Sequence, residues 1–246
     1  MPISETNAFV IGSKSFGEQD KLVYLLTETQ GVKKGIAPGA NKNKNRFGSV
    51  FELFTEGHFI YNWKELKNII TISKGEIIKS NFNLIANSND IFYFYLMAEI
   101  LQRAIPENQI NSRIYRLLDS IIKSREQKVD IKFLLTYFVI WFLKIEGLMF
   151  KTNICYNCFK KNTKLAFLRD DYRGVLCKNC ATTEKNTLNE YELQLIDWIF
   201  CNSPSNNKWR SINKINQTNL TKILHIFLNK IEIHNELSLK SKIYLF

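Results

Sequence analysis

The sequence predicts an α+β protein, in which a small five-stranded β-barrel precedes an α-helical body with an inserted four-cysteine hairpin of the zinc-ribbon kind. Three observations predict this class. Short β-type segments separated by turn residues fill the first 80 residues, helical periodicity begins at Ser88, and two Cys-x-x-Cys pairs interrupt the helical part. We therefore expect residues 1–80 to form one domain and residues 81–246 a helical domain, with residues 151–185 as the zinc-binding insertion.

The first region contains five β-type segments without an intervening helix of full length. The connection Thr29–Gly31 offers a glycine where a tight turn needs a positive φ. Such a succession suits a small closed barrel, although two packed hairpins would also fit. The expected strands are Thr6–Ile11, Lys21–Thr27, Val32–Ala37, Val50–Tyr61 and Ile69–Ser73.

The remainder has the spacing of helices. Asp130–Glu146 is apolar nearly all round, which indicates a helix surrounded by others, and Gly147 is expected to end it. Thr187 and Glu190 have the spacing of a capping box before a further apolar segment. We therefore expect a helical bundle. Two amphipathic stripes cover Ile114–Ile122 and Leu220–Ile231.

The chain is strongly basic. Lys and Arg number 34 against 23 Asp and Glu, which gives a formal net charge of +11 and a pI near 9.3. A surplus of this size favours a polyanionic partner, because each neutralised phosphate releases counterions. A Lys- and Asn-rich composition imposed by codon bias is the alternative explanation.

Neither a secretory signal nor a membrane span is expected. The N-terminal segment has no basic stretch that leads into an apolar one. The longest apolar run, Phe133–Leu143, falls short of the roughly 18 residues that a membrane span needs. We expect a soluble, cytoplasmic protein whose reduced cysteines favour a metal over disulfides.

Cys155–Cys158 and Cys177–Cys180 are two Cys-x-x-Cys pairs separated by 18 residues. Each pair can place two thiolates on one side of a turn, and two such turns complete a tetrahedral site. Four thiolates favour zinc, with iron as the alternative. Because all four ligands are cysteine, no position is left for water or substrate, and the zinc is expected to be structural. A redox dithiol fits less well, since neither pair lies in a βαβ pattern. Cys201 is expected to be buried.

A basic loop follows the third expected strand. Cations beside an aromatic side chain, here Phe47, suit single-stranded nucleic acid, because charge follows the phosphates and rings stack on bases. A solvated loop rich in Asn and Lys is the alternative. The candidate DNA contacts are Lys33, Lys34, Lys42, Lys44 and Arg46.

No catalytic constellation is found in the sequence. His58, His225 and His234 are scattered, no His-Glu-x-x-His motif occurs, and no carboxylate cluster suggests two-metal chemistry. A catalytic zinc would need an open coordination position, which four cysteines do not leave. We therefore expect a protein that is not an enzyme.

Two landmarks follow one another along the chain. In Phe16–Ala40 a strand ending in Thr, a Gly turn and a second strand precede the basic loop. Later, the apolar helix ending at Gly147 is followed by the first cysteine pair and by Gly174–Cys177 before the second pair is completed. In the order and spacing of these landmarks the sequence resembles the RecO family of bacterial DNA repair proteins.

The resemblance implies an OB-fold at residues 1–80, zinc held by Cys155, Cys158, Cys177 and Cys180, and DNA contacts around the five cations named above. It also implies a place in the RecF recombination pathway. Members of that family bind single- and double-stranded DNA and single-strand DNA-binding protein, anneal complementary strands, and work with RecR to load RecA. A zinc-ribbon adaptor that binds other proteins, without a direct DNA function, is the alternative. The C-terminal Ile243–Phe246 is expected to join the core, with docking onto a partner as the alternative.

Overall fold

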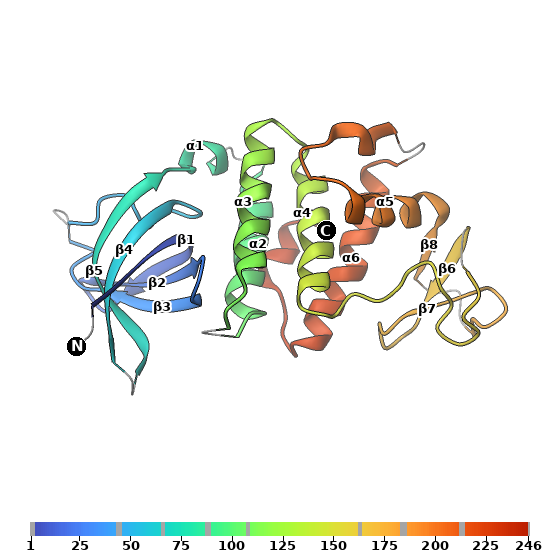
Figure 1. The fold of residues 1–246 in the computed structure, drawn as a ribbon, viewed down its shortest axis with the longest axis horizontal. Helices are drawn as coiled ribbons and strands as arrows, with labels where there is room; N and C mark the ends of the chain where they lie inside the picture. Colours follow the sequence, from blue (N-terminus) through green and yellow to red (C-terminus); the bar gives the residue numbers. More distant parts are fainter. Residues whose placement is uncertain are drawn as a thin grey trace. The chain divides into compact units, whose positions relative to one another are not determined.

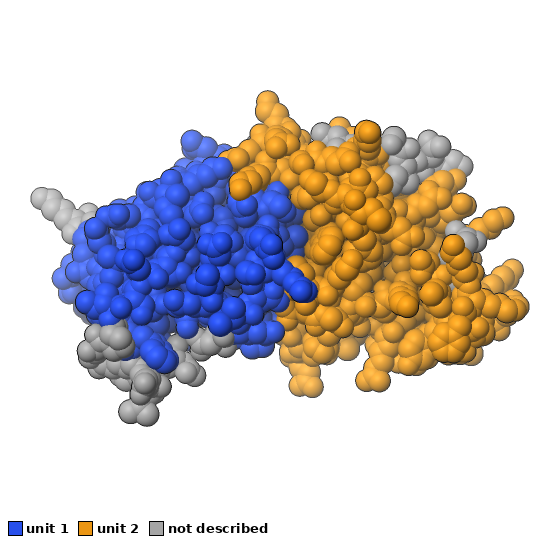
Figure 2. All heavy atoms as spheres, in the orientation of Figure 1, with its two compact units in different colours: residues 1–122, 239–246 blue, residues 123–238 orange. Residues whose placement is uncertain are grey.

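The computed structural model of the chain describes residues 3–42, 46–64, 67–86, 90–106, 109–161, 164–182, 186–211 and 215–245. It divides into two compact units, one of residues 1–122 with 239–246 and the other of residues 123–238 (Figure 2). The first compact unit therefore contains the first helices as well as the barrel. The domain boundary expected at residue 80 instead lies between the strands and the helices. That domain division stays a prediction.

A closed five-stranded barrel forms most of the first unit (Figure 1). Its strand order is β1-β2-β3-β5-β4, and all neighbours are antiparallel except β3 and β5. A five-stranded Greek-key barrel of this kind is an OB-fold, so the predicted barrel is confirmed and the alternative of two packed hairpins is wrong. The strands are β1 (Ile3–Phe16), β2 (Asp20–Thr27), β3 (Gly31–Ala37), β4 (Glu56–Lys64) and β5 (Lys67–Lys79).

The barrel encloses one apolar cluster. Successive strand residues point to opposite faces, so alternate residues of each strand supply this cluster. Phe59, which is fully buried, lies with its ring centroid 6.2 Å from that of Phe51. The cluster consists of Ala8, Val10, Val23, Leu25, Ala37, Ala40, Phe47, Val50, Phe51, Phe59, Tyr61, Ile70 and Ile72.

The expected strand Val50–Tyr61 is wrong in its first half, because β4 begins only at Glu56. Residues 47–54 form turns, and Phe54 has a positive φ of 54°. The Phe54 amide donates to the Val10 carbonyl at 2.7 Å, and the Val10 amide donates to the Thr55 carbonyl at 3.0 Å. The apolar residues before Glu56 thus belong to a buried turn rather than to a strand.

The first unit also contains α1 (Phe82–Ile85), α2 (Ile91–Arg103), most of α3 (Ser112–Glu126) and η2 (Lys240–Tyr244). α2 packs on β1 and on η2. The expectation that the C-terminal segment joins the core is wrong for Ile243 and Tyr244, which are 75% and 64% exposed. Leu239 is the buried anchor of this segment. Leu245 is half-buried, and Phe246 lies outside the described residues.

The second unit contains α4 (Ile131–Ile145), α5 (Glu190–Cys201), η1 (Asn207–Ser211), α6 (Gln217–His234) and a small sheet, β6 (Leu165–Leu168), β7 (Val175–Leu176) and β8 (Thr187–Asn189). α4 packs against α5 and α6, as Figure 1 shows for α6. Most α4 side chains are buried, as expected from their composition. The chain leaves α4 through Gly147, whose φ of 72° few other residues adopt.

Two local predictions in this unit are wrong. Thr187 belongs to β8, which pairs with β6, so the capping box of α5 is made two residues later by Asn189 and Glu192. Cys201, the last residue of α5, is exposed rather than buried. Among the helices described, none is long and apolar enough to cross a bilayer.

Candidate metal centre and nucleic-acid interface

The four predicted ligands come together at one point of the second unit. The Sγ atoms of Cys155, Cys158, Cys177 and Cys180 all lie within 4.8 Å of one another. Two short turns position them. In the first turn the Phe159 amide donates to the Cys155 carbonyl at 3.0 Å, and in the second the Cys180 amide donates to the Cys177 carbonyl at 3.0 Å.

Backbone pairing joins the two turns. Cys155 forms a β-bridge with Val175, the first residue of β7, and the Tyr156 amide donates to the Val175 carbonyl at 2.7 Å. β7 leads directly to Cys177, so this pairing sets the distance between the two cysteine pairs. A Cβ atom at Gly174 would lie 2.9 Å from the Tyr156 ring, so glycine is needed for the close approach.

The distances and the chemistry fit a tetrahedral metal. Zn–S bonds of about 2.3 Å give a tetrahedron with edges of about 3.8 Å, and the Sγ atoms of Cys158 and Cys177 are 3.7 Å apart. Burial raises the pKa of the Cys155 thiol, but hydrogen bonds from the backbone amides of Cys158, Cys177 and Asn157 outweigh it and lower that pKa to about 6. Four neighbouring thiolates repel one another unless a cation lies between them, so this cluster could hold a metal ion.

The two lysines predicted on β3 lie on opposite faces of the strand. Lys33 is directly opposite Leu25 of the barrel core, and Lys34 is opposite Tyr24. Burial lowers the pKa of Lys33. The Lys34 Nζ lies 5.8 Å from the centroid of the Tyr24 ring, on the outer surface of the barrel. Only Lys34 is therefore placed as an outward contact.

In the basic loop, Lys42 and Arg46 are exposed, while Lys44 lies outside the described residues. Phe47 is only 4% exposed and belongs to the barrel core, with its ring centroid 5.0 Å from that of Phe51. The expectation that Phe47 could stack on a base is therefore wrong, because its ring closes the barrel. Lys42 and Arg46 remain as surface cations, and Arg46 lies over the Phe47 ring at 5.0 Å.

Comparison with known families matches both parts of the chain. The family described as recombination protein O N terminal matches residues 1–81, and the family described as recombination protein O C terminal matches residues 87–243. The chain belongs to the RecO family. RecO proteins are DNA repair proteins, and this member carries both parts of the family along nearly all of its length.

Individual RecO proteins are similar to the chain over most of their lengths. The DNA repair protein RecO of Clostridium novyi is 26% identical over 232 residues, which are 94% of this chain and 90% of that protein. The DNA repair protein RecO of Thermoanaerobacter sp. is 22% identical over 98% of this chain and 96% of its own length. The protein of the same name from Listeria monocytogenes is 29% identical over 72% of this chain and 69% of its own length.

The barrel of this RecO-family chain presents two further side chains that sequence reasoning missed. Tyr24 lies between Gly12 of β1 and Lys34 of β3 in the cross-strand register, and Lys14 lies diagonally beside it. These residues come from three separate strands, so no local motif reveals them. The one available signal is the alternation in β2, which places Tyr24 opposite in direction to the buried Val23 and Leu25.

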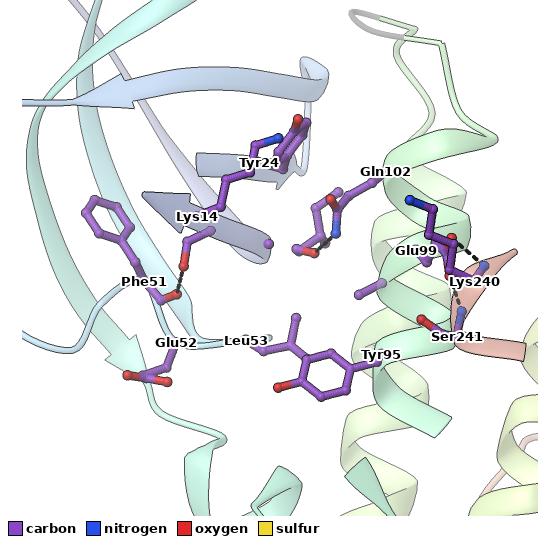
Figure 3. A pocket seen from close by; sticks show the side chains of 14 residues that line it. Lys14, Tyr24, Phe51, Glu52, Leu53, Tyr95, Glu99, Gln102, Lys240 and Ser241 are labelled. Atoms are coloured by element: carbon purple, nitrogen blue, oxygen red, sulfur yellow. Dashed lines mark hydrogen bonds between the residues drawn. The ribbon is translucent and has the colours of Figure 1, made fainter. Parts of the chain in front are cut away.

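Next to this surface lies a pocket of about 440 Å³ within the first unit. Figure 3 shows Lys14 and Tyr24 from the barrel on one side, Tyr95 and Gln102 from α2 on the other, and Lys240 from the C-terminal segment. The Gln102 Nε2 donates to the carbonyl of Ile11 at 2.5 Å, where β1 has a bulge. This hydrogen bond fixes α2 against the barrel.

Glu99 holds the C-terminal segment at the rim of this pocket. Its carboxylate accepts hydrogen bonds from the backbone amides of Lys240 at 2.9 Å and Ser241 at 2.8 Å, and pairs with Arg103 at 2.7 Å. Burial raises the pKa of Glu99, but these donors outweigh it and keep the pKa below its ordinary value. The wall formed by Lys240 therefore depends on an ionised Glu99.

Proposed function

We propose that this chain is a non-enzymatic recombination mediator that binds single- and double-stranded DNA and promotes the annealing of complementary strands. In the RecF pathway it helps to load RecA onto DNA coated by single-strand DNA-binding protein, with RecR as a partner, in the bacterial cytoplasm at the nucleoid. Membership of the RecO family, together with a closed barrel that presents cations on its surface, is the observation that carries this proposal.

Annealing requires a surface rather than bond-making chemistry. Cations on the protein lower the repulsion between two phosphate backbones, and base pairing then supplies the free energy. Of the predicted contacts we assign phosphates to Lys34, Lys42, Lys44 and Arg46, and we leave out Lys33 because it lies on the core-facing side of β3. Lys14 and Tyr24 extend this surface, because Tyr24 is an aromatic side chain between two cations, an arrangement that suits one stacked base and its flanking phosphates.

Cys155, Cys158, Cys177 and Cys180 would hold Zn²⁺, with iron as the alternative. Bound there, the metal would supply folding free energy to a loop with few apolar contacts of its own. All four ligands are thiolates, so a structural role is proposed and no reaction step passes through the metal.

Transfer of a strand from single-strand DNA-binding protein needs a second kind of surface. The acidic, apolar-ended tail of that protein would suit an apolar groove bordered by Lys or Arg. Titration with a synthetic tail peptide tests this part of the proposal, and an absence of saturable binding at low salt would contradict it.

The main test is the annealing of complementary oligonucleotides coated with single-strand DNA-binding protein, measured over a salt series. We expect the zinc-loaded chain to accelerate annealing, and the acceleration to fade as salt rises. Replacement of Lys34, Lys42 and Arg46 by alanine should weaken single-strand binding and lower the dependence of log affinity on log salt by about 0.7 per phosphate contact.

Lys74→Ala is the matched control, because this exposed barrel lysine is already paired with Glu76 at 2.5 Å. It should leave annealing nearly unchanged. If the folded, zinc-loaded chain shows neither DNA binding nor annealing at low salt, the protein-binding adaptor becomes the better account.

A further inference from the structure

The exposed surface around the two cysteine turns carries cations and rings that the barrel site does not use. Residues 151–182 contain seven Lys or Arg side chains and two Asp. A divalent metal held by four thiolates would add two negative charges and still leave a positive excess. We call ribbon face the exposed side chains of Lys151, Tyr156, Phe159, Lys160, Arg173 and Lys178.

Part of the negative charge nearby is already neutralised. Asp171 accepts two hydrogen bonds from the Arg169 guanidinium, at 3.0 and 2.8 Å, and Arg169 lies over the Tyr156 ring at 4.3 Å. Among the described residues no carboxylate forms an ion pair with Lys151, Lys160 or Lys178. These lysines are therefore available to an anion from outside the chain.

Phe159 is the residue that points most directly to a ligand. It follows Cys158 in the first turn with a φ of 60°, a left-handed conformation that is an outlier for a bulky side chain. Its side chain is 78% exposed. A glycine would satisfy the turn without strain, so the fold gains nothing from a phenyl ring in water here.

A pocket of about 600 Å³ adjoins this ring. Phe150, Ile154, Tyr156 and Phe159 supply its apolar walls, and Lys151 and Arg173 border it. Aromatic walls with cations at the border suit a base that stacks while its phosphates lie outside.

We propose that the ribbon face binds a second single strand of DNA, separate from the strand bound by the barrel. This inference rests on the proposed function, since annealing requires two strands and the barrel and the ribbon face belong to different compact units. Phe159 stacks on a base of the second strand, and Lys151, Lys160 and Lys178 contact its phosphates.

Nucleic acid fits the ribbon face better than an acidic peptide does. Lys160 lies beside the first cysteine turn, Lys178 lies within the second, and Lys151 borders the pocket, so the cations are spread around the metal site rather than gathered at one end of the pocket. Several separate cations match the repeated phosphates of a strand.

The experiment uses the whole, zinc-loaded chain, bound to an immobilised oligothymidylate as the first strand. A fluorescent strand that is not complementary to it is then added as the second strand. The wild type should capture this second strand. Phe159→Gly should weaken the capture at least about fivefold, since stacking on one base contributes about 1–3 kcal/mol. The first-strand affinity of this variant should equal that of the wild type.

Lys160→Ala with Lys178→Ala should lower the salt slope of second-strand capture by about 1.4, the value for two phosphate contacts on single-stranded DNA. Lys128→Gly is the matched control for Phe159→Gly, because Lys128 is an exposed residue of the same unit with a φ of 60°. It should not change capture. Metal content and near-ultraviolet circular dichroism verify that each variant is folded.

Each outcome decides a different claim. Second-strand capture that Phe159→Gly leaves intact, or first-strand binding by the wild type without any second-strand capture, overturns this inference and leaves the proposed function standing. Absence of single-strand binding altogether overturns the proposed function itself. If an acidic peptide ending in Phe loses affinity for Phe159→Gly while capture is unchanged, the ribbon face is a protein-docking surface and the inference is overturned.

Discussion

The barrel and the four-cysteine segment, residues 151–182, are stabilised by different interactions. The barrel surrounds a continuous apolar cluster from all five strands and the turn before β4. The described part of residues 151–182 buries few apolar side chains besides Cys155, namely Ala166, Phe167, Leu168 and Val175. A segment with so little apolar burial depends on its thiol cluster, so the two regions should respond to different perturbations.

Metal removal should produce the largest difference in stability between the two regions. Apparent zinc binding in finger peptides is on the order of 10 kcal/mol or more, so chelation or Cys177→Ser should remove the fixed structure of residues 151–182. Amide hydrogen exchange should show lost protection there and retained protection in β1–β5. Cys201→Ser is the control, because Cys201 is exposed and outside the cluster. Equal loss in the barrel would contradict the separation.

Phe59→Ala perturbs the opposite region. Phe59 is fully buried in the barrel cluster, and its loss leaves a cavity. We expect the free energy of unfolding of the first unit to fall by about 3–5 kcal/mol. Denaturant titration of the whole chain measures this change. Metal affinity, measured by competition with a chromophoric chelator, should stay at the wild-type value. A matching fall in metal affinity would show that the regions are coupled.

Glu192→Ala tests how much a buried polar network stabilises the helices of the second unit. The Glu192 side chain is 1% exposed, accepts from the Asn189 amide at 2.8 Å, and pairs with Lys222 at 2.8 Å. Its removal leaves the donors of α5 and α6 without their acceptor, which should cost about 1–3 kcal/mol in thermal unfolding experiments. Glu192→Gln, which keeps an acceptor oxygen, should cost less. Equal losses would indicate that packing alone matters.

The smallest expected effect is a pH dependence of the C-terminal attachment. The pKa of Glu99 is lowered in the folded chain, so its contribution to stability is present above the ordinary Glu pKa and is lost as the pH falls through the lowered value. As the pH falls, the protection of the Lys240 and Ser241 amides against hydrogen exchange should therefore decrease. The decrease is measured relative to the intrinsic exchange rate at each pH. Glu99→Gln should remove that decrease, and persistence of the decrease would assign it to another group.

Features that depend on short spacings could be predicted from the sequence. Cys155–Cys158 and Cys177–Cys180 contain their ligand spacing within four residues each, and the metal-type cluster follows once the two turns meet. The apolar character of α4 and the glycine after it were equally local. The five-stranded barrel was predicted because each strand, turn and glycine appears in order along the chain.

Positions that depend on register and on distant segments could not be predicted. Lys33 and Lys34 are neighbours in sequence, but strand alternation puts them on opposite faces of β3, and Lys34 is the one that lies beside Tyr24. In the sequence Phe47 has the position of a ring that could bind a base, but the folded barrel buries it in the core.

The sequence by itself determined the order of the barrel and the helices and the cysteine pairs, because each depends on residues only a few positions apart, and it determined the positive charge, because that is a property of composition alone. Only the tertiary structure decided which face each cation occupies, which rings are buried, and that Phe159 stands exposed at a strained turn. Exposure and juxtaposition arise when distant segments pack, and neither composition nor periodicity along the chain records that packing.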